Sequence, residues 1–328
     1  MGLQLVAEKC RSSFFYFVKT FWNVIIKEEP VYNWHIEALC DELQALSVSI
    51  VDRKDKPYDL IINIPPGTTK STITTIMFPA WLWTQDATIR IITNSYSSDL
   101  SIEHATKSRD IITSEKYRRL FPNIVLRRDK AAKSSYENTA TGARYTTSTG
   151  GTITGKHAHV VINDDPLNPA QAASDADRNT ANEHTKTLAS RKVDKKNTPT
   201  ITIMQRLHEM DVTGYILFRC FYNLCRCSGH TLIVCYDIFY LCRLRVYAHG
   251  RVYGCQRRRD VEASARGEAQ DTQGQQRRSL CGHNRRLSRA RKSVVDDIFS
   301  GVRACVCRSA CADSDSGRVA GGIRRVRA

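Results

Sequence analysis

The sequence predicts an α/β fold, a doubly wound and mainly parallel sheet flanked by helices, followed by a disordered or poorly packed tail. Apolar runs of strand length alternate with longer segments of helical spacing through residues 51–217, which is the pattern of strands joined by crossover helices. One of these runs leads through a short turn into the polar pair Lys70-Ser71, and another ends in the acidic pair Asp164-Asp165. Because the ends of parallel strands meet at one ligand crevice, we expect the two pairs to lie close together.

Residues 1–50 are expected to form a helical segment that packs on the rest of the chain. The run 14–26 is aromatic and apolar, but Lys19 interrupts it. An amphipathic helix packed on the core is therefore favoured over membrane contact. A second helix is expected to begin at Trp34 and His35. These two side chains could contact an adenine base; the alternative is a core tryptophan beside a surface histidine.

A strand over 60–64 is followed by a turn that we interpret as a phosphate-binding loop. Its backbone N–H groups and the N-terminus of the next helix would face an anion, Lys70 would neutralise the outer phosphates, and the Ser71 hydroxyl would ligate Mg²⁺. Thr69 replaces the usual glycine before the lysine, so a plain β-turn before a capped helix is the alternative. The residues expected to bind the nucleotide here are Pro66, Gly67, Thr68, Thr69, Lys70, Ser71 and Thr72.

Further apolar runs continue the alternation as far as an acidic pair. The expected elements are strands over 87–93, 142–148 and 159–162 and a helix over 98–112. The strand over 159–162 leads through Asn163 into Asp164 and Asp165. The first carboxylate can hold Mg²⁺ and the second can activate an attacking water. An Asp-Asp-Pro turn without such a role is the alternative.

One more helix and one more strand precede a polar segment. They are expected over 174–189 and 199–204. The strand leads into Gln205 and Arg206, which could sense the γ-phosphate of a nucleotide and relay its loss. A surface location for both side chains is the alternative.

Two groups of residues suggest metal binding, and neither fits a metal site. His157 and His159 share one face of a strand, but no third ligand is evident, so packing or surface roles are favoured. The Cys-x-Cys pairs at 225–227 and 305–307 lack the Cys-x₂-Cys spacing usual for zinc. Nothing in the sequence favours a disulfide framework either.

The composition changes abruptly near residue 218. Residues 219–328 contain 21 Arg, one Lys and nine acidic residues, so they carry +13 of the chain's net charge of +16, and they hold ten of its 12 cysteines. Such sequence is typical of a disordered tail, but we favour an out-of-frame translation of the gene. The predicted organisation is therefore a helical segment over 1–50, a nucleotide-binding domain over 51–217, and an aberrant tail over 218–328.

Several linked motifs occur in a consistent order. They are Asn63-Ile64-Pro65-Pro66 before Lys70-Ser71, Gly155 before the acidic strand, and Gln205-Arg206-Leu207-His208 with Asp211 and Gly214. Over residues 32–217 this set resembles the ATPase domain of the large terminase subunit of tailed bacteriophages. Residues 92–96 and 120–122 are also similar to that family, as are two segments of the tail when read in a shifted frame. The resemblance implies a P-loop fold of the ASCE type, in which the Lys-Ser and Asp-Asp pairs belong to the Walker A and Walker B motifs.

The same resemblance implies an ATP-hydrolysing motor that drives double-stranded DNA into a procapsid, with ATP and Mg²⁺ as cofactors. The implied roles are phosphate binding by Lys70, Mg²⁺ binding by Ser71 and Asp164, activation of water by Asp165, and coupling of hydrolysis to movement by Gln205 and Arg206. A basic residue from a neighbouring subunit would stabilise the transition state, with Lys156 and Arg144 as candidates. The family often has Arg at Gly67 and Gly at Thr69, and these departures bear on the turnover rate.

The resemblance also implies partners and a location. We expect a homo-oligomeric ring that contacts double-stranded DNA, a portal protein and the small terminase subunit, in the host cytoplasm and transiently at the procapsid portal, with no membrane involved. The family's RNase H-like nuclease has no counterpart after Phe218, so no nuclease activity is assigned. A related helicase-type translocase and a non-functional fragment are the alternatives.

Overall fold

A computed structural model describes residues 2–132, 134–224, 233–237, 242–246 and 252–256. The helices are α1 (Leu3–Ser12), α2 (Phe14–Ile25), α3 (Trp34–Val51), the π-helix η1 (Thr72–Met77), α4 (Phe78–Gln85), α5 (Ser98–Thr113), α6 (Glu115–Leu120), α7 (Asp175–Ala189) and α8 (Val212–Leu224). The strands are β1 (Asp59–Asn63), β2 (Arg90–Ser95), β3 (Leu126–Ala131), β4 (Ser135–Asn138), β5 (Ala143–Ser148), β6 (Val160–Asp164), β7 (Thr200–Met204), β8 (Ile233–Asp237), β9 (Cys242–Val246) and β10 (Val252–Gln256).

Within these described segments the strands form one sheet, in the order β10-β9-β8-β1-β7-β6-β2-β5-β4-β3. The strands from β8 to β5 run parallel, and antiparallel strands extend both edges. The strand β7 lies between β1, which precedes the phosphate loop, and β6, which ends in the acidic pair. An additional strand at this place defines the ASCE type of P-loop fold. The predicted fold class is therefore confirmed.

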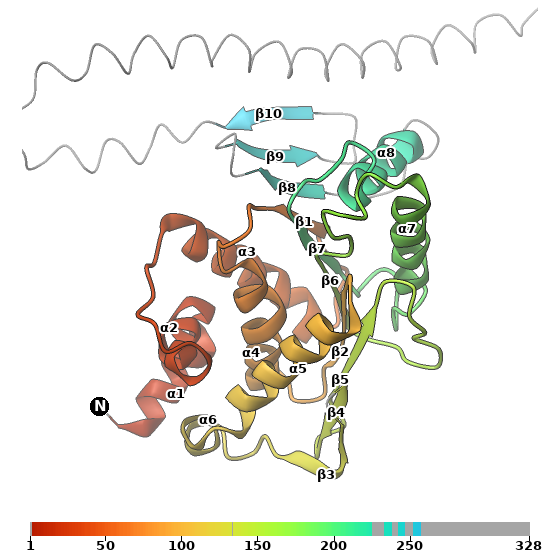
Figure 1. The fold of residues 1–328 in the computed structure, drawn as a ribbon. Helices are drawn as coiled ribbons and strands as arrows, with labels where there is room; N and C mark the ends of the chain where they lie inside the picture. Colours follow the sequence, from red (N-terminus) through yellow and green to blue (C-terminus); the bar gives the residue numbers. More distant parts are fainter. Residues whose placement is uncertain (1, 133, 225–232, 238–241, 247–251, 257–328) are drawn as a thin grey trace, which may run out of the picture. The chain divides into compact units, whose positions relative to one another are not determined.

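Helices cover both faces of the sheet, with α1–α6 on one face and α7 and α8 on the other (Figure 1). Successive side chains of β2 alternate between two cores: Ile91 packs in the larger core beneath α2–α5, and Ile92 packs with Leu188 of α7. Strands buried on both faces read as continuous apolar runs rather than alternating ones. This is why β1, β2, β6 and β7 were readily predicted from the sequence.

The N-terminal segment is helical and packs on the sheet domain. The helix α2 buries Phe14, Phe17 and Phe21, and the ring centroid of Phe14 lies 5.0 Å from that of Trp81 in α4. Among the described residues no helix has the length and apolarity needed to span a bilayer. The aromatic run therefore belongs to the core of the protein.

Two groups of strands were not predicted. The hairpin of β3 and β4 pairs antiparallel with the edge of β5. Three further strands, β8–β10, fall within residues 218–328, where no strand pattern was expected, and β8 runs parallel to β1. The helix α8 also crosses the predicted boundary at 217. Most of the predicted tail, including residues 257–328, lies outside the described residues, so its out-of-frame origin stays a prediction.

Candidate active site

The phosphate loop leaves the carboxyl end of β1 and contains two residues with left-handed backbone. Gly67 has φ 77° and Thr69 has φ 61°. Glycine adopts this conformation freely, whereas a β-branched residue is strained there. Local bonds hold the loop: the Thr68 hydroxyl donates to the Pro65 carbonyl at 2.7 Å, and the Thr69 hydroxyl donates to the Thr68 carbonyl at 2.6 Å. Thr69 therefore takes the conformation that a glycine usually supplies.

The helix that follows starts directly at the end of this loop. Helical residues begin at Lys70 and continue through η1 into α4. The widened turn of η1 bonds the Phe78 N–H to the Ile73 carbonyl, and it accommodates Pro79, which has no N–H to donate. Free N–H groups and the helix dipole favour an anion at such an N-terminus. The loop and helix thus provide a site suited to phosphate.

The structure brings the Lys-Ser pair and the acidic pair together. The Nζ of Lys70 lies 2.6 Å from Oδ2 of Asp165, and the Ser71 hydroxyl donates to Oδ1 of Asp164 at 3.0 Å. These contacts join residues 95 and 93 positions apart in the sequence. Lys70 is 7% exposed, so its charge is neutralised mainly by Asp165. The two motifs face each other at one end of the parallel sheet.

Asp164 carries a buried oxygen without a hydrogen-bond donor. Its Oδ2 is one of the buried atoms with no hydrogen-bond partner among the described residues. Burial, followed by the charge of Asp165, raises the pKa of Asp164 to about 7, while Thr75, Lys70 and Ser71 act in the opposite direction. A carboxylate and a hydroxyl are oxygen ligands that suit Mg²⁺. Asp164 and Ser71 therefore provide oxygen atoms that could bind a metal ion.

The protein supplies few other ligands for a metal. In the part of the chain that the structure describes, no group of three or more His, Cys, Asp or Glu side chains could hold a metal ion. This includes His157 and His159, for which packing or surface roles were favoured. Mg²⁺ at Ser71 and Asp164 would need its remaining ligands from phosphate oxygens and water, which is common for this ion.

Asp165 connects the phosphate loop to the segment after β7. Its backbone is left-handed, with φ 41°, and its N–H donates to the Ile203 carbonyl at 2.8 Å. While Oδ2 holds Lys70, Oδ1 accepts the backbone N–H of Gln205 at 3.3 Å. A rotation of this carboxylate would therefore change its hydrogen bond to the Gln205 N–H.

Arg206 is engaged away from the phosphate loop. Its Nε donates to Oδ2 of Asp211 at 3.0 Å, and its NH2 group contacts the carbonyls of His208 and Glu209. Asp211 is fully buried and also accepts the backbone N–H of Gly214 at the start of α8. A Cβ at Gly214 would lie 1.7 Å from the Glu209 oxygen. In this state Arg206 stabilises the connection between β7 and α8.

Of the two residues predicted to contact the base, His35 lies beside the loop. His35 Nε2 is 3.4 Å from the Thr68 carbonyl oxygen. Trp34 is 50% exposed, so the alternative of a core tryptophan is wrong. The exposed indole, whose ring centroid lies 6.2 Å from that of His35, offers a flat apolar surface on which a base can stack.

The two candidates for a residue acting on a neighbouring subunit differ in burial. Arg144 is 1% exposed and lies on β5 inside the domain, so it cannot reach another subunit. Lys156 is exposed, and its Nζ lies 4.7 Å from the centroid of the Tyr145 ring. Arg144 is therefore excluded from this role, and Lys156 is retained.

A buried cluster behind Asp164 was missed in the sequence analysis. Nδ1 of His104, on α5, lies 3.5 Å from Oδ2 of Asp164. Burial and the charge of Arg144 lower the pKa of His104 to about 4. Burial also lowers the pKa of Arg144, against the influence of Tyr136 and Asp164. A histidine within a polar helix gives no sign of this contact in the sequence.

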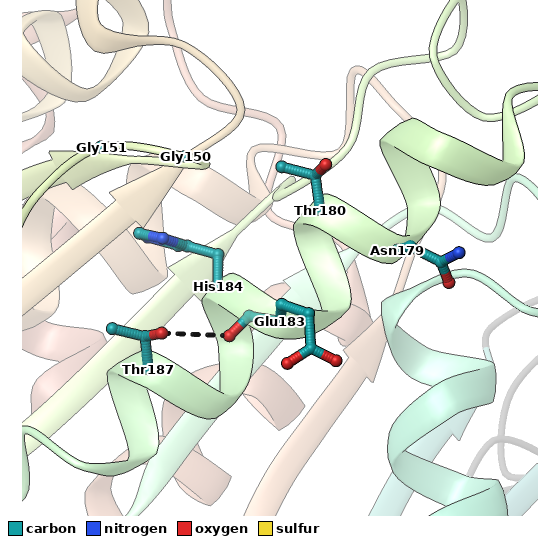
Figure 2. A pocket seen from close by; sticks show the side chains of 7 residues that line it. All are labelled: Gly150, Gly151, Asn179, Thr180, Glu183, His184 and Thr187. Atoms are coloured by element: carbon teal, nitrogen blue, oxygen red, sulfur yellow. Dashed lines mark hydrogen bonds between the residues drawn. The ribbon is translucent and has the colours of Figure 1, made fainter.

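A shallow cavity of about 460 Å³ lies elsewhere, between the turn after β5 and α7 (Figure 2). It is lined by Gly150, Gly151, Asn179, Thr180, Glu183, His184 and Thr187. None of these is among the predicted site residues. Nε2 of His184 is 3.0 Å from Oδ1 of Asn94, so that side chain already has a polar partner. The cavity and the Lys-Ser/Asp-Asp site are separate features of the surface.

The fold is a mainly parallel α/β sheet flanked by helices, of the P-loop type. No protein-family model and no curated protein matches the sequence. Among solved structures, the crystal structure of the HK97 bacteriophage large terminase is similar in fold, with a TM-score of 0.43 and 12% sequence identity. The match covers 65% of this chain and 41% of that chain, so this chain spans less than half of that structure's length. The function proposed below therefore rests on the motifs and the geometry of the site.

Proposed function

We propose that this chain binds and hydrolyses Mg-ATP as the ATPase part of a motor that moves double-stranded DNA into a procapsid. One observation carries the nucleotide site: Lys70 and Ser71 each contact one member of the Asp164-Asp165 pair, at 2.6 and 3.0 Å. A cation, a hydroxyl and two carboxylates at the N-terminus of a helix are the groups that phosphoryl transfer needs. The packaging role comes from the linked motifs of the sequence.

The resting contacts indicate what must change when nucleotide binds. Lys70 is paired with Asp165, and it must turn to the phosphates to neutralise them. That exchange leaves Oδ2 of Asp165 free to orient or deprotonate the attacking water. Ser71 and Asp164 would hold Mg²⁺, which when bound neutralises charge on the β- and γ-phosphates. Lys70 thus serves both as a phosphate ligand and as the group that masks Asp165 until nucleotide arrives.

The contact between Asp165 and Gln205 supports a route from hydrolysis to movement. The Gln205 N–H donates to the same carboxylate that pairs with Lys70. Arg206, its neighbour, is joined through Asp211 to the start of α8. A reorientation of Asp165 during turnover would therefore act on the connection between β7 and α8.

The proposed setting is a homo-oligomeric ring on a portal protein, with the small terminase subunit and double-stranded DNA as partners, in the host cytoplasm. In such a ring an exposed cation from the adjacent subunit could reach the γ-phosphate. Lys156 has the exposure that this role requires. The second candidate function is a helicase-type translocase with the same nucleotide chemistry; unwinding activity on a duplex with a single-stranded tail would favour it.

The nucleotide site is tested by calorimetric titration of the full chain with Mg-ATP, together with phosphate release. Lys70→Ala should abolish binding, because the cation that neutralises the outer phosphates is lost. Asp165→Asn should retain binding and lose hydrolysis, because the amide cannot accept a proton. If wild type shows no heat with any nucleotide, the proposal is wrong and the chain is a non-functional fragment. If both variants hydrolyse ATP normally, the assigned roles are wrong.

A further inference from the structure

We propose that His104 and Arg144 are positioning residues that hold the Asp164 carboxylate in place for the metal–nucleotide complex, an inference that rests on the proposed function. Neither residue would touch nucleotide or metal. His104 lies beside Oδ2 of Asp164, whereas Ser71 contacts Oδ1, and His104 and Arg144 together would fix the direction of that second oxygen.

The alternation of side chains places the three groups on one face of the sheet. Arg144 pairs in register with Ile91, and Asp164 lies two residues beyond Ile162 on β6. Side chains at such positions share a face, and both isoleucines belong to the larger core. The helix α5, which carries His104, covers this face next to β2 and β5 (Figure 1). Three chain segments distant in sequence thus deliver a carboxylate, a guanidinium and an imidazole to one buried location.

Several buried polar atoms of this cluster have no hydrogen-bond partner among the described residues. Asp164 Oδ1 is occupied by Ser71, whereas Asp164 Oδ2, His104 Nδ1, and Nε and NH1 of Arg144 are buried without a partner among the described residues. The closest approach is 3.5 Å, between His104 Nδ1 and Asp164 Oδ2. Buried polar groups are normally paired, because an unpaired one costs free energy. A small rotation of Asp164 would let its second oxygen accept from His104.

A purely structural role explains Arg144 poorly. Its NH2 group lies 3.5 Å from the Thr93 hydroxyl, its other polar neighbour is the phenol of Tyr136, which pairs with it across β4 and β5, and no carboxylate forms an ion pair with it among the described residues. A buried arginine without such a partner is costly, and an apolar residue of similar size often stabilises a protein at such a place. The carboxylate that its charge acts on is Asp164. The role that fits this location is electrostatic: the charge of Arg144 would keep the Asp164 carboxylate in the orientation that binds the metal.

Residues that orient a metal ligand typically change metal affinity by roughly 10- to 100-fold when they are replaced. The test measures binding of a fluorescent ATP analogue to the full chain in EDTA and then across an MgCl₂ titration. His104→Leu and Arg144→Met should leave the affinity in EDTA within about twofold of wild type and raise the half-maximal Mg²⁺ concentration by about tenfold. His104→Asn, which keeps an N–H donor at the δ position, and Arg144→Lys, which keeps the charge, should recover most of that shift.

His159→Leu is the matched control, because His159 lies at the opposite end of β6 and its Nδ1 accepts the Arg90 N–H at 3.0 Å. It should leave the Mg²⁺ titration unchanged. Folding of every variant is checked by circular dichroism. If His104→Leu fails to fold, Arg144→Met compared with Arg144→Lys still tests the proposal. If wild type shows Mg²⁺-dependent binding and the variants have the same half-maximal Mg²⁺ concentration as wild type, the positioning roles alone are wrong. Wild type without Mg²⁺-dependent binding overturns the positioning roles and the proposed function together.

Discussion

Replacing Thr69 with glycine should stabilise the free protein. Thr69 has φ 61°, and a left-handed backbone costs an L-residue roughly 1–2 kcal/mol. Glycine removes this strain but loses more conformational entropy on folding, which offsets roughly 0.5–1 kcal/mol. The hydroxyl bond to the Thr68 carbonyl is local and half-exposed, so water can replace it. We therefore expect a net gain of about 0.5–1 kcal/mol in the free energy of unfolding.

Urea unfolding of the full chain, followed by tryptophan fluorescence, measures this gain as a shift of the midpoint at constant m-value. Thr68→Gly is the control, because the adjacent threonine has no positive φ and its hydroxyl bonds the Pro65 carbonyl. It should lower the free energy of unfolding by about 0.5–1 kcal/mol. If Thr69→Gly destabilises the protein as much as Thr68→Gly does, the strain argument is refuted.

Three further outcomes follow from the site. Because the pKa of Asp164 is raised from 3.8 to about 7, its contribution to stability is fully present below pH 4 and is lost as the pH rises through 7. Thermal melts without Mg²⁺ should therefore show a loss of up to about 4 kcal/mol over that window, which Asp164→Asn removes. Asp211→Ala should cost about 2–4 kcal/mol in urea unfolding, because the Gly214 N–H at the start of α8 and Nε of Arg206 lose their acceptor; a cost below about 1 kcal/mol would contradict the role of Asp211 in holding the start of α8. Lys156→Ala should preserve ATP binding by the single chain and slow hydrolysis only in an assembled ring, and an equal loss in both states would argue against action on a neighbouring subunit.

The strands and the two polar pairs could be predicted because their signals are local. The buried strand β6 is a continuous apolar run, and its carboxylates follow it directly in the sequence. Parallel pairing then brings distant strand ends together without any knowledge of side-chain packing. The same logic predicted that Lys70 and the Asp164-Asp165 pair would lie close together.

The features that were missed depend on tertiary contacts. His104 lies among polar residues of α5, and only the packing of α5 on the sheet reveals what it faces. Arg144 was a candidate for contact with another subunit because burial of a single arginine cannot be judged from a strand of mixed residues. The hairpin of β3 and β4 carries charged side chains, which protect an edge strand from pairing with other chains but hide its identity.

The sheet extends beyond residue 217, where the local pattern led us to end it. A change in composition after residue 218 led us to expect no strands there. The strand β8 nevertheless runs parallel to β1 over Ile233–Asp237, where β-branched residues favour a strand. Sequencing of the encoding DNA would settle the frame directly: an insertion or deletion near the codons for residues 217–220 supports the out-of-frame origin, and an uninterrupted homologous frame refutes it.

A crystal structure of the full chain with Mg²⁺ and a non-hydrolysable ATP analogue tests the central claim most directly. We expect the triphosphate at the turn 66–72, Lys70 Nζ moved from Asp165 to a phosphate oxygen, and the metal held between Ser71 and Asp164. Nucleotide found instead in the cavity beside α7, with the Lys70–Asp165 pair intact at 2.6 Å, would contradict the account.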